Sequence, residues 1–213
     1  MSFYQITKPV QWLTAILLVL FGTYLIITDH GDFVLWLNER HSAFGDVFFS
    51  YWTYVGDGVV LGLVALYLLF KNYYRFFTML IAIVFQTLFV HLFKQVLFSG
   101  ELRPQGYFAD IIEQLNFVDG VVVRSFNSFP SGHTASAFTL CFFLMLMVKQ
   151  TSAQLSLLVA AVLVGVSRVY ILQHFGRDIF VGAIFGILSV LIAQQLMKKY
   201  EGRPRLQRGL IKT

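Results

Sequence analysis

The sequence predicts an all-α integral membrane protein with six transmembrane helices, and two observations lead to this fold class. The 213 residues are 57% hydrophobic and only 13% charged, which is more apolar surface than one soluble core of this size can hide. The chain also contains separate apolar stretches whose lengths approach the roughly 20 residues that a helix needs to cross a bilayer. We therefore expect one membrane-embedded domain that covers residues 1–213.

Six apolar stretches are the candidate spans. In chain order they are residues 10–28, 55–70, 76–98, 133–148, 155–172 and 179–197. The first stretch has no basic segment before it and no small-residue cleavage site after it, so we interpret it as a retained span rather than a signal peptide. No repeat array or disordered linker indicates a second domain.

Basic residues gather on alternate connections, and this sets the expected orientation because Lys and Arg resist translocation. The cations on one side are Lys8, Lys71, Arg75, Lys149, Lys198, Lys199, Arg203, Arg205, Arg208 and Lys212. We expect this side to be cytoplasmic, with both termini on it (N-in/C-in), in the cytoplasmic (inner) membrane. The basic tail, residues 198–213, follows a span directly, so topology and anionic lipid headgroups explain it better than a nucleic-acid partner does.

The opposite connections are acidic at first and then carry the candidate chemistry. The first of them, which includes residues 32–49, is rich in Phe, Trp and Leu, and we expect either short helices along the outer interface or plain packing. The long connection 105–129 carries Arg124 and several aromatic residues. Long ordered loops often line binding sites, so our hypothesis is that this connection shapes headgroup choice.

A corner of Pro130, Ser131, Gly132 and His133 opens the fourth apolar stretch. Proline halts the preceding loop, serine is a good helix N-cap, and glycine allows close backbone approach. The N–H groups of the first turn and the positive end of the helix dipole would favour a bound phosphate. An ordinary capped helix is the alternative, but His133 favours a site because it could protonate a departing oxygen.

A second pair of polar residues, His174 and Asp178, stands four apart where the last span begins. They share one face if the helix reaches back to His174. The carboxylate could then hold one ring nitrogen and leave the other to attack phosphorus. Asp178 alone could be an interfacial anchor, and the histidine at the matching offset weakens that alternative.

Three cations accompany these groups: Arg168, Lys94 and Arg103. Each alone could be a side chain that snorkels to the membrane boundary. All three, however, fall on the same predicted side as both histidines. Three cations, two histidines and a helix N-terminus facing one compartment would stabilise a pentavalent phosphoryl group.

Metal and cysteine chemistry are not expected. The lone Cys141 lies in an apolar stretch and is interpreted as helix packing, and no Cys or His cluster has structural zinc spacing. The sequence also lacks the dense carboxylate set of metal-dependent phosphatases. We predict no metal and no cofactor.

Together these motifs resemble those of the phosphatidic acid phosphatase type 2 (PAP2) family of membrane phosphatases. That signature consists of Lys, six residues and Arg-Pro; then Pro-Ser-Gly-His; then Ser-Arg, five residues, His, three residues and Asp. The second and third pieces match residues 130–133 and 167–178. In the first piece, eight residues separate Lys94 from Arg103. Either the connection bulges, which Ser99-Gly100 favours, or Lys94 is displaced.

The resemblance implies a PAP2/haloperoxidase-like helical bundle with its motif core in residues 94–178. It implies that His174 is the nucleophile that forms a phosphohistidine, that Asp178 orients it, and that His133 protonates the leaving group and later activates water. The residues that it implies for binding the phosphate are Lys94, Arg103, Ser131, Gly132 and Arg168.

The expected function is therefore metal-independent removal of phosphate from a membrane lipid phosphate or pyrophosphate at the outer face of the cytoplasmic membrane. The candidate substrates are undecaprenyl pyrophosphate, phosphatidylglycerophosphate, phosphatidic acid and lipid A phosphates. One alternative is a lipid-headgroup transporter or flippase without hydrolysis, although the polar residues lie at span ends rather than at the midplane. Haloperoxidase chemistry is a third possibility, but those relatives are generally soluble.

Overall fold

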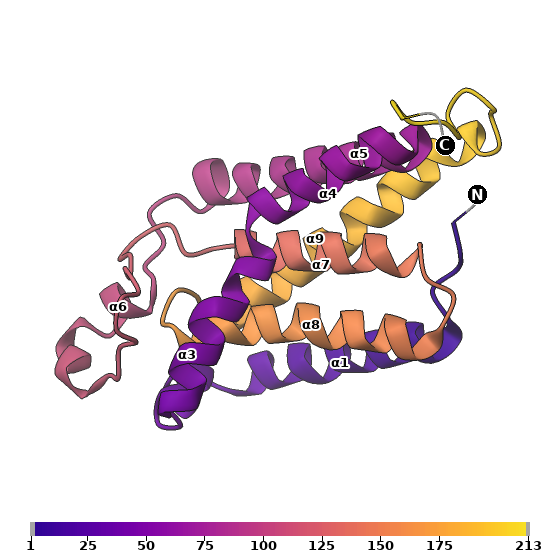
Figure 1. Ribbon diagram of the computed structural model, residues 1–213. Coiled ribbons are helices and arrows are strands. Elements are labelled where there is room, and N and C mark those ends of the chain that lie inside the picture. Colours follow the sequence, from indigo (N-terminus) through magenta and orange to yellow (C-terminus); the bar gives the residue numbers. More distant parts are fainter. Residues whose placement is uncertain (1–2, 212–213) are drawn as a thin grey trace.

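A computed structural model describes residues 3–211, and this part of the chain is a bundle of helices (Figure 1). The α-helices are α1 Lys8–Ile27, α2 Asp32–Asn38, α3 Ala43–Trp52, α4 Gly58–Lys71, α5 Tyr73–His91, α6 Pro104–Tyr107, α7 Gly132–Met145, α8 Thr151–Tyr170 and α9 Gly176–Met197. Short 3-10 helices cover Thr53–Gly56, Ala109–Gln114 and Lys198–Tyr200, and a π-helix covers Leu92–Leu97. Lys212, in the predicted basic tail, lies outside the described residues.

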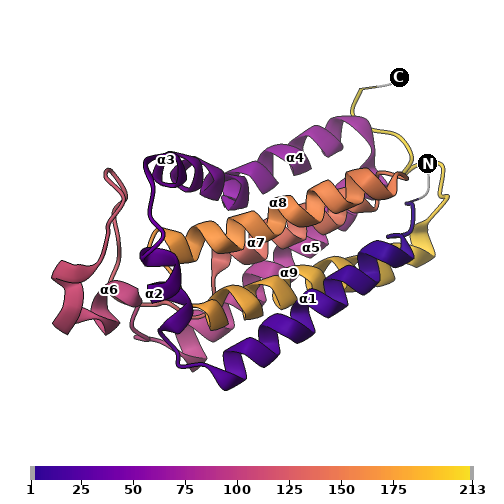
Figure 2. The same ribbon diagram turned by 90° about the horizontal axis from the view of Figure 1, so that it is seen from below.

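Helix α7 is the centre of the bundle. In Figures 1 and 2 it lies between α8 and the pair α5 and α9, while α1 runs along the outside of α8 and α9. Eleven of its 14 residues are buried, so α7 contacts protein on nearly every side. Cys141 is one of these buried residues, as expected for a packing role.

Two glycines of α9 allow it to pack directly on the backbone of α7. A Cβ atom added at Gly182 would lie 2.6 Å from the carbonyl oxygen of Ser131, and one added at Gly186 would lie 2.5 Å from that of Ala135. Real Cβ atoms do not approach oxygen this closely, so only glycine fits at these two positions. Small residues spaced four apart are the usual means by which membrane helices approach each other.

The predicted six spans agree with the structure only in part. Four helical segments are long and apolar enough to cross a membrane by themselves: Lys8–Ile27, Tyr73–Leu97, Thr151–Tyr170 and Gly176–Tyr200. A fifth span requires α3 and α4 to count together across a bend of 46°. The expected span 133–148 is α7, whose 14 residues reach only about 21 Å, short of a hydrocarbon core of about 30 Å. Because other helices enclose α7, it does not need the length of a helix that crosses the bilayer in contact with lipid.

One end of the bundle brings together the connections that carry the predicted cytoplasmic cations. Buried Gln154 on α8 accepts a hydrogen bond from the Thr7 N–H (2.8 Å) and donates one to the Met145 carbonyl (3.2 Å), so the N-terminal segment meets the α7–α8 turn. The Tyr73 N–H donates to the Arg208 carbonyl (2.8 Å), which fastens the C-terminal tail to the α4–α5 turn. Figure 1 shows both termini at this end.

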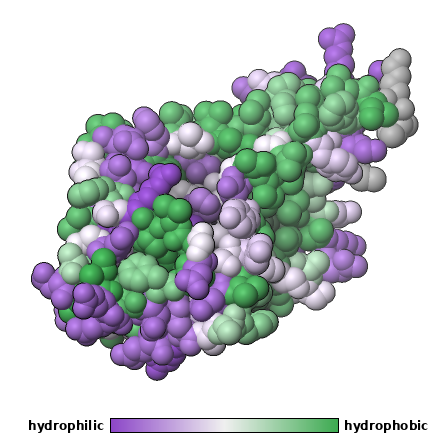
Figure 3. Space-filling model, turned by 60° about the vertical axis from the view of Figure 1, so that its left-hand side comes forward, coloured by the Kyte–Doolittle hydropathy of each residue, from purple (hydrophilic) through white to green (hydrophobic). Residues whose placement is uncertain are grey.

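The opposite end holds the long connections. Segment 32–49 forms α2 and most of α3, so the expected short helices are present there. The connection 105–129 contains most of α6 and a 3-10 helix and projects beyond the bundle (Figure 1). Polar side chains gather at this end, whereas apolar side chains cover the helices farther along (Figure 3).

Replacing Gly182 by Ala is expected to destabilise the bundle by about 1–3 kcal/mol, because the new methyl group overpacks the contact with the Ser131 backbone. Thermal unfolding of the purified protein in detergent measures this loss. The matched control is Gly62→Ala on α4, where an added Cβ meets nothing within 4 Å and alanine is the better helix former. Equal melting temperatures for the two variants would contradict the role of Gly182.

Candidate active site

The link between α8 and α9 positions the His174 side chain. Helix α8 ends at Tyr170, Leu172 adopts a φ of 56°, and the His174 N–H donates to the carbonyl oxygen of Arg168 (3.1 Å). Helix α9 begins only at Gly176, so His174 precedes the helix and the condition for a shared helix face is not met. The link nevertheless places His174 Nδ1 3.2 Å from Asp178 Oδ2.

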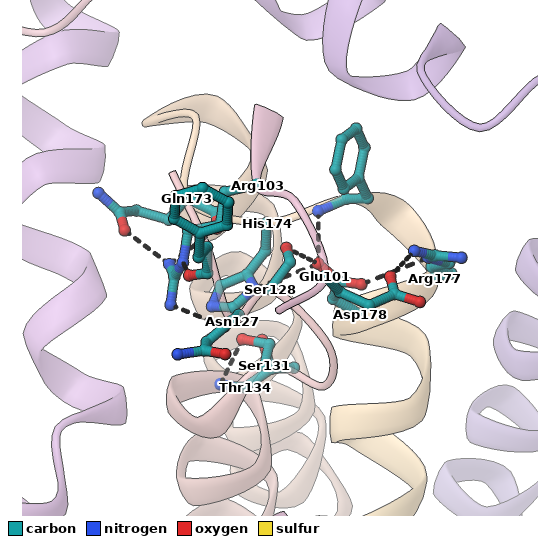
Figure 4. Close-up of polar contacts among 12 residues, drawn as sticks. Glu101, Arg103, Asn127, Ser128, Ser131, Thr134, Gln173, His174, Arg177 and Asp178 are labelled. Atoms are coloured by element: carbon teal, nitrogen blue, oxygen red, sulfur yellow. Dashed lines mark hydrogen bonds and ion pairs between the residues drawn. The ribbon is translucent and has the colours of Figure 1, made fainter. Parts of the chain in front are cut away.

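The Asp178 carboxylate is held from three directions (Figure 4). Its Oδ2 atom accepts hydrogen bonds from Ser128 Oγ and from the Phe175 N–H (2.9 Å), and it faces His174 Nδ1. Asp178 is fully buried, and Arg177 Nε lies 3.7 Å from its Oδ1 atom. A carboxylate in this position keeps the histidine proton on Nδ1, so that Nε2 is free to act as a nucleophile.

The surroundings of His174 favour the neutral imidazole. Burial lowers its pKa well below the usual 6.5, and the positive charges of Arg103 and Arg168 lower it further. A neutral ring with an oriented Nε2 is the form that can attack phosphorus.

The corner of residues 130–133, which precedes most of α7, lies against Asp178. Ser131 is the N-cap of α7, as predicted, and its Oγ accepts from the Thr134 N–H (3.3 Å). The Ser131 N–H donates to the backbone carbonyl of Asp178 (3.0 Å). This contact holds the first turn of α7, which carries His133, beside the start of α9.

A cavity of about 960 Å³ opens above these groups. Six of the eight predicted site residues line it: Lys94, Arg103, Gly132, His133, Arg168 and His174. The other two, Ser131 and Asp178, are fully buried. Ser131 belongs to the corner and caps α7, and Asp178 contacts His174. The structure therefore brings the three motifs together around one cavity.

Arg103 is fixed by protein acceptors on several sides. Its Nε donates to the Phe126 carbonyl (2.9 Å), and its Nη1 donates to both the backbone oxygen (2.9 Å) and the side-chain oxygen (2.8 Å) of Gln173. Burial and the charge of Arg124 lower the pKa of Arg103 to about 10, so the guanidinium still carries its charge near neutral pH.

Arg168 is anchored once and otherwise available. Its Nη1 donates to Thr53 Oγ1 (2.9 Å), while its buried Nε has no hydrogen-bond partner among residues 3–211. A buried N–H without a hydrogen-bond acceptor destabilises the fold, and an anion in the cavity would supply an acceptor for the Nε–H of Arg168.

Lys94 reaches the cavity although its spacing from Arg103 is longer than in the family signature. The Phe98 N–H donates to the Phe93 carbonyl (2.8 Å) in the π-helix that contains Lys94, and Gly100 then turns the chain with a φ of 84°. A π-turn accommodates an extra residue within a helix. Of the two alternatives, the structure has the bulged connection, with a π-helix around Lys94 and a turn at Ser99-Gly100, and Lys94 is not displaced from the cavity.

The sequence did not indicate three residues that support the site. Ser128 contacts Asp178, Gln173 joins Arg103 to the Val122 carbonyl, and Thr53 anchors Arg168. Each is a common polar residue in a connection or at a helix end, so nothing in its local sequence marks it. Within the described part of the chain, no group of three or more His, Cys, Asp or Glu side chains could hold a metal ion.

Removing the Ser128 hydroxyl is expected to slow the reaction while the fold persists. A hydrogen bond to a charged group contributes about 1.5–3 kcal/mol, so Ser128→Ala is expected to lower kcat roughly tenfold or more by loosening Asp178. Release of phosphate from a lipid monophosphate measures the change. Ser156→Ala on the exposed face of α8 is the control, and equal rates for both variants would rule out this positioning role.

A sequence model of the PAP2 superfamily matches residues 75–201, more than half of the chain. The lipid A 4'-phosphatase of Bacteroides thetaiotaomicron is 28% identical over 159 residues, which cover 72% of this chain and 70% of that protein. The bacitracin transport permease protein BcrC of Bacillus licheniformis is 42% identical over 65 residues, only 30% of this chain and 31% of the relative.

Solved structures show the same fold. The crystal structure of Aquifex aeolicus LpxE aligns with a TM-score of 0.66 and 29% identity over 77% of this chain and 93% of that one. The PAP2 type phosphatidylglycerolphosphate phosphatase of Bacillus subtilis aligns with a TM-score of 0.57 and 21% identity over 92% of this chain and 98% of that one. The chain therefore belongs to the PAP2 superfamily, and we assign it to the membrane phosphatases of that family.

Proposed function

We propose that this protein is a metal-independent phosphatase that hydrolyses a membrane lipid phosphate or pyrophosphate through a phosphohistidine. The observation that carries the proposal is the contact between His174 Nδ1 and the buried Asp178 carboxylate (3.2 Å), at a cavity lined by Lys94, Arg103 and Arg168. An oriented, neutral histidine facing three cations suits attack on a phosphoryl group better than binding alone.

In the first step, His174 Nε2 attacks phosphorus, a phosphorus–nitrogen bond forms, and the bond to the leaving oxygen breaks. His133 gives its proton to that oxygen. In the second step, His133 takes a proton from water, the resulting hydroxide attacks phosphorus, and the phosphorus–nitrogen bond breaks. Inorganic phosphate leaves and His174 is restored. The three cations and the first-turn N–H groups of α7 would stabilise the equatorial oxygens in both steps.

The proposed substrates are lipid phosphates because the cavity lies at one end of an apolar bundle, where a headgroup can enter while its chains stay in the bilayer. The names of the relatives favour this class, since they include a lipid A 4'-phosphatase and a phosphatidylglycerolphosphate phosphatase. Undecaprenyl pyrophosphate, phosphatidylglycerophosphate, phosphatidic acid and lipid A phosphates remain the candidates.

The proposed setting is a single domain that crosses the cytoplasmic membrane six times, with both termini in the cytoplasm and the site at the outer face. Two features support this orientation. The connections that carry the basic residues meet at the end of the bundle where the termini lie, and the site occupies the other end. Basic connections are retained in the cytoplasm, so the cavity would open to the periplasm or the cell exterior.

Replacing His174 by Ala is expected to abolish phosphate release, whereas His91→Ala, at an exposed position on α5, is expected to leave it intact. Purified protein is assayed on a panel of the four lipid classes with EDTA present. Wild-type protein quenched during turnover of a radiolabelled substrate is expected to carry acid-labile phosphate that the His174 variant lacks. Phosphate release that EDTA abolishes, or phosphate release by the His174 variant, would overturn the mechanism. A His174 variant that binds lipid and keeps its biological activity would favour transport.

The pH profile of kcat/KM is expected to have its acidic limb well below 6.5. Burial and Arg103 lower the pKa of His174 below that value, so the nucleophile stays neutral and competent until the pH falls through the lowered pKa. Initial rates at low substrate concentration give this profile, because kcat/KM reports the free enzyme. An acidic limb at or above 6.5 would contradict a neutral His174.

A further inference from the structure

Arg124 is a cavity cation that none of the three motifs includes. It belongs to the connection 105–129, and its side chain lines the cavity together with residues 117–122 of the same connection. The side chain is exposed, and within residues 3–211 no hydrogen bond or ion pair engages it. An arginine at a cavity wall without a protein partner is available to a ligand.

The carboxylates that line the cavity do not neutralise Arg124. Asp46 is already engaged, because its Oδ1 accepts from the Tyr170 hydroxyl (2.7 Å) and lies 3.0 Å from His41 Nδ1. Asp119, on the same connection, forms no ion pair with Arg124 in the described structure. The charge of Arg124 therefore faces the cavity uncompensated.

Arg124 is also close enough to Arg103 and Arg168 to act on them electrostatically. After burial, the charge of Arg124 is the largest cause that lowers the pKa of Arg103, to about 10. Like charges repel across a cavity, and an anion placed between them removes the repulsion. One phosphoryl group already has Lys94, Arg103, Arg168 and the first turn of α7 as partners, so Arg124 is a surplus cation for a substrate with a single phosphate.

We propose that Arg124 forms a subsite for a second phosphate group on the same substrate molecule. The inference rests on the proposed function and specifies its substrate class, a lipid diphosphate or a lipid with phosphates at two positions. With a diphosphate, His174 attacks the terminal phosphorus and the bond to the bridging oxygen breaks. The bridging oxygen and its electrons stay with the leaving lipid monophosphate, whose charge Arg124 stabilises.

The test compares wild type, Arg124→Gln and Arg124→Lys on farnesyl diphosphate and farnesyl monophosphate in the same detergent. Arg124→Gln is expected to lower kcat/KM for the diphosphate roughly tenfold or more and for the monophosphate less than about threefold, because a charge-assisted hydrogen bond is lost only in the first case. Arg124→Lys should keep part of the diphosphate rate. A synthetic lipid A that carries two separate phosphates, compared with its monophosphate, distinguishes the two substrate geometries.

Arg40→Gln is the matched control, since Arg40 is exposed, pairs with Glu39 and does not line the cavity. It should change neither rate. Equal losses of Arg124→Gln on one-phosphate and two-phosphate substrates would reduce Arg124 to a general electrostatic role. No loss on either farnesyl substrate and on both lipids A would refute the subsite.

A binding measurement separates failure of this inference from failure of the proposed function. Calorimetric titration of each variant with methylenediphosphonate and with inorganic phosphate requires no turnover. Arg124→Gln is expected to weaken methylenediphosphonate binding about tenfold and phosphate binding far less. If wild-type protein hydrolyses no lipid phosphate but Arg124→Gln still weakens methylenediphosphonate binding selectively, the phosphatase is refuted and the subsite is supported. If wild-type protein is active and Arg124→Gln shows no selective loss, in binding or in rates, the subsite is refuted and the phosphatase is supported.

Discussion

The site depends on one buried residue, Asp178, because it joins segments that are distant in the sequence. Its carboxylate holds Ser128 and His174, and its backbone carbonyl accepts the Ser131 N–H (3.0 Å). Ser128 in turn donates its own N–H to the Glu101 carbonyl (3.1 Å), close to Arg103 in the chain. A buried charge is stable only when its partners are in place, so the same contacts that stabilise Asp178 fix the relative positions of all three motifs.

Much of the fold follows from the sequence because apolar length and the distribution of basic residues are strong signals. The four long helices lie within a few residues of their predicted stretches, and the basic connections share one end. The exceptions are the two stretches at 55–70 and 133–148, which form helices of 14 residues each. Apolar composition does not distinguish a helix that faces lipid from one enclosed by its neighbours, and α7 is of the second kind.

The sequence predicted those site residues that belong to short motifs. Residues close together in the sequence, such as Ser131 and His133, reveal a capped corner through their local chemistry, and the structure has that cap. The partners of the motifs could not be read in the same way. Gln173 and Thr53 act through contacts across 70 and 115 positions of the sequence, and such contacts leave no local pattern. The sequence around Lys94 likewise gave no sign of the π-helix that the structure has there.

The C-terminal tail has a consequence for the biogenesis of the protein. The Tyr73 and Tyr74 N–H groups at the start of α5 donate to carbonyl oxygens of Arg208 and Leu206, which the ribosome adds only after α5 to α9. The Ser131 N–H similarly has no acceptor until Asp178 of α9 has been synthesised. Insertion of the earlier helices therefore leaves both the α4–α5 turn and the phosphate corner incomplete. The phosphate corner can form only after α9 has been synthesised, and the turn can close only after residues 206–208 have left the ribosome.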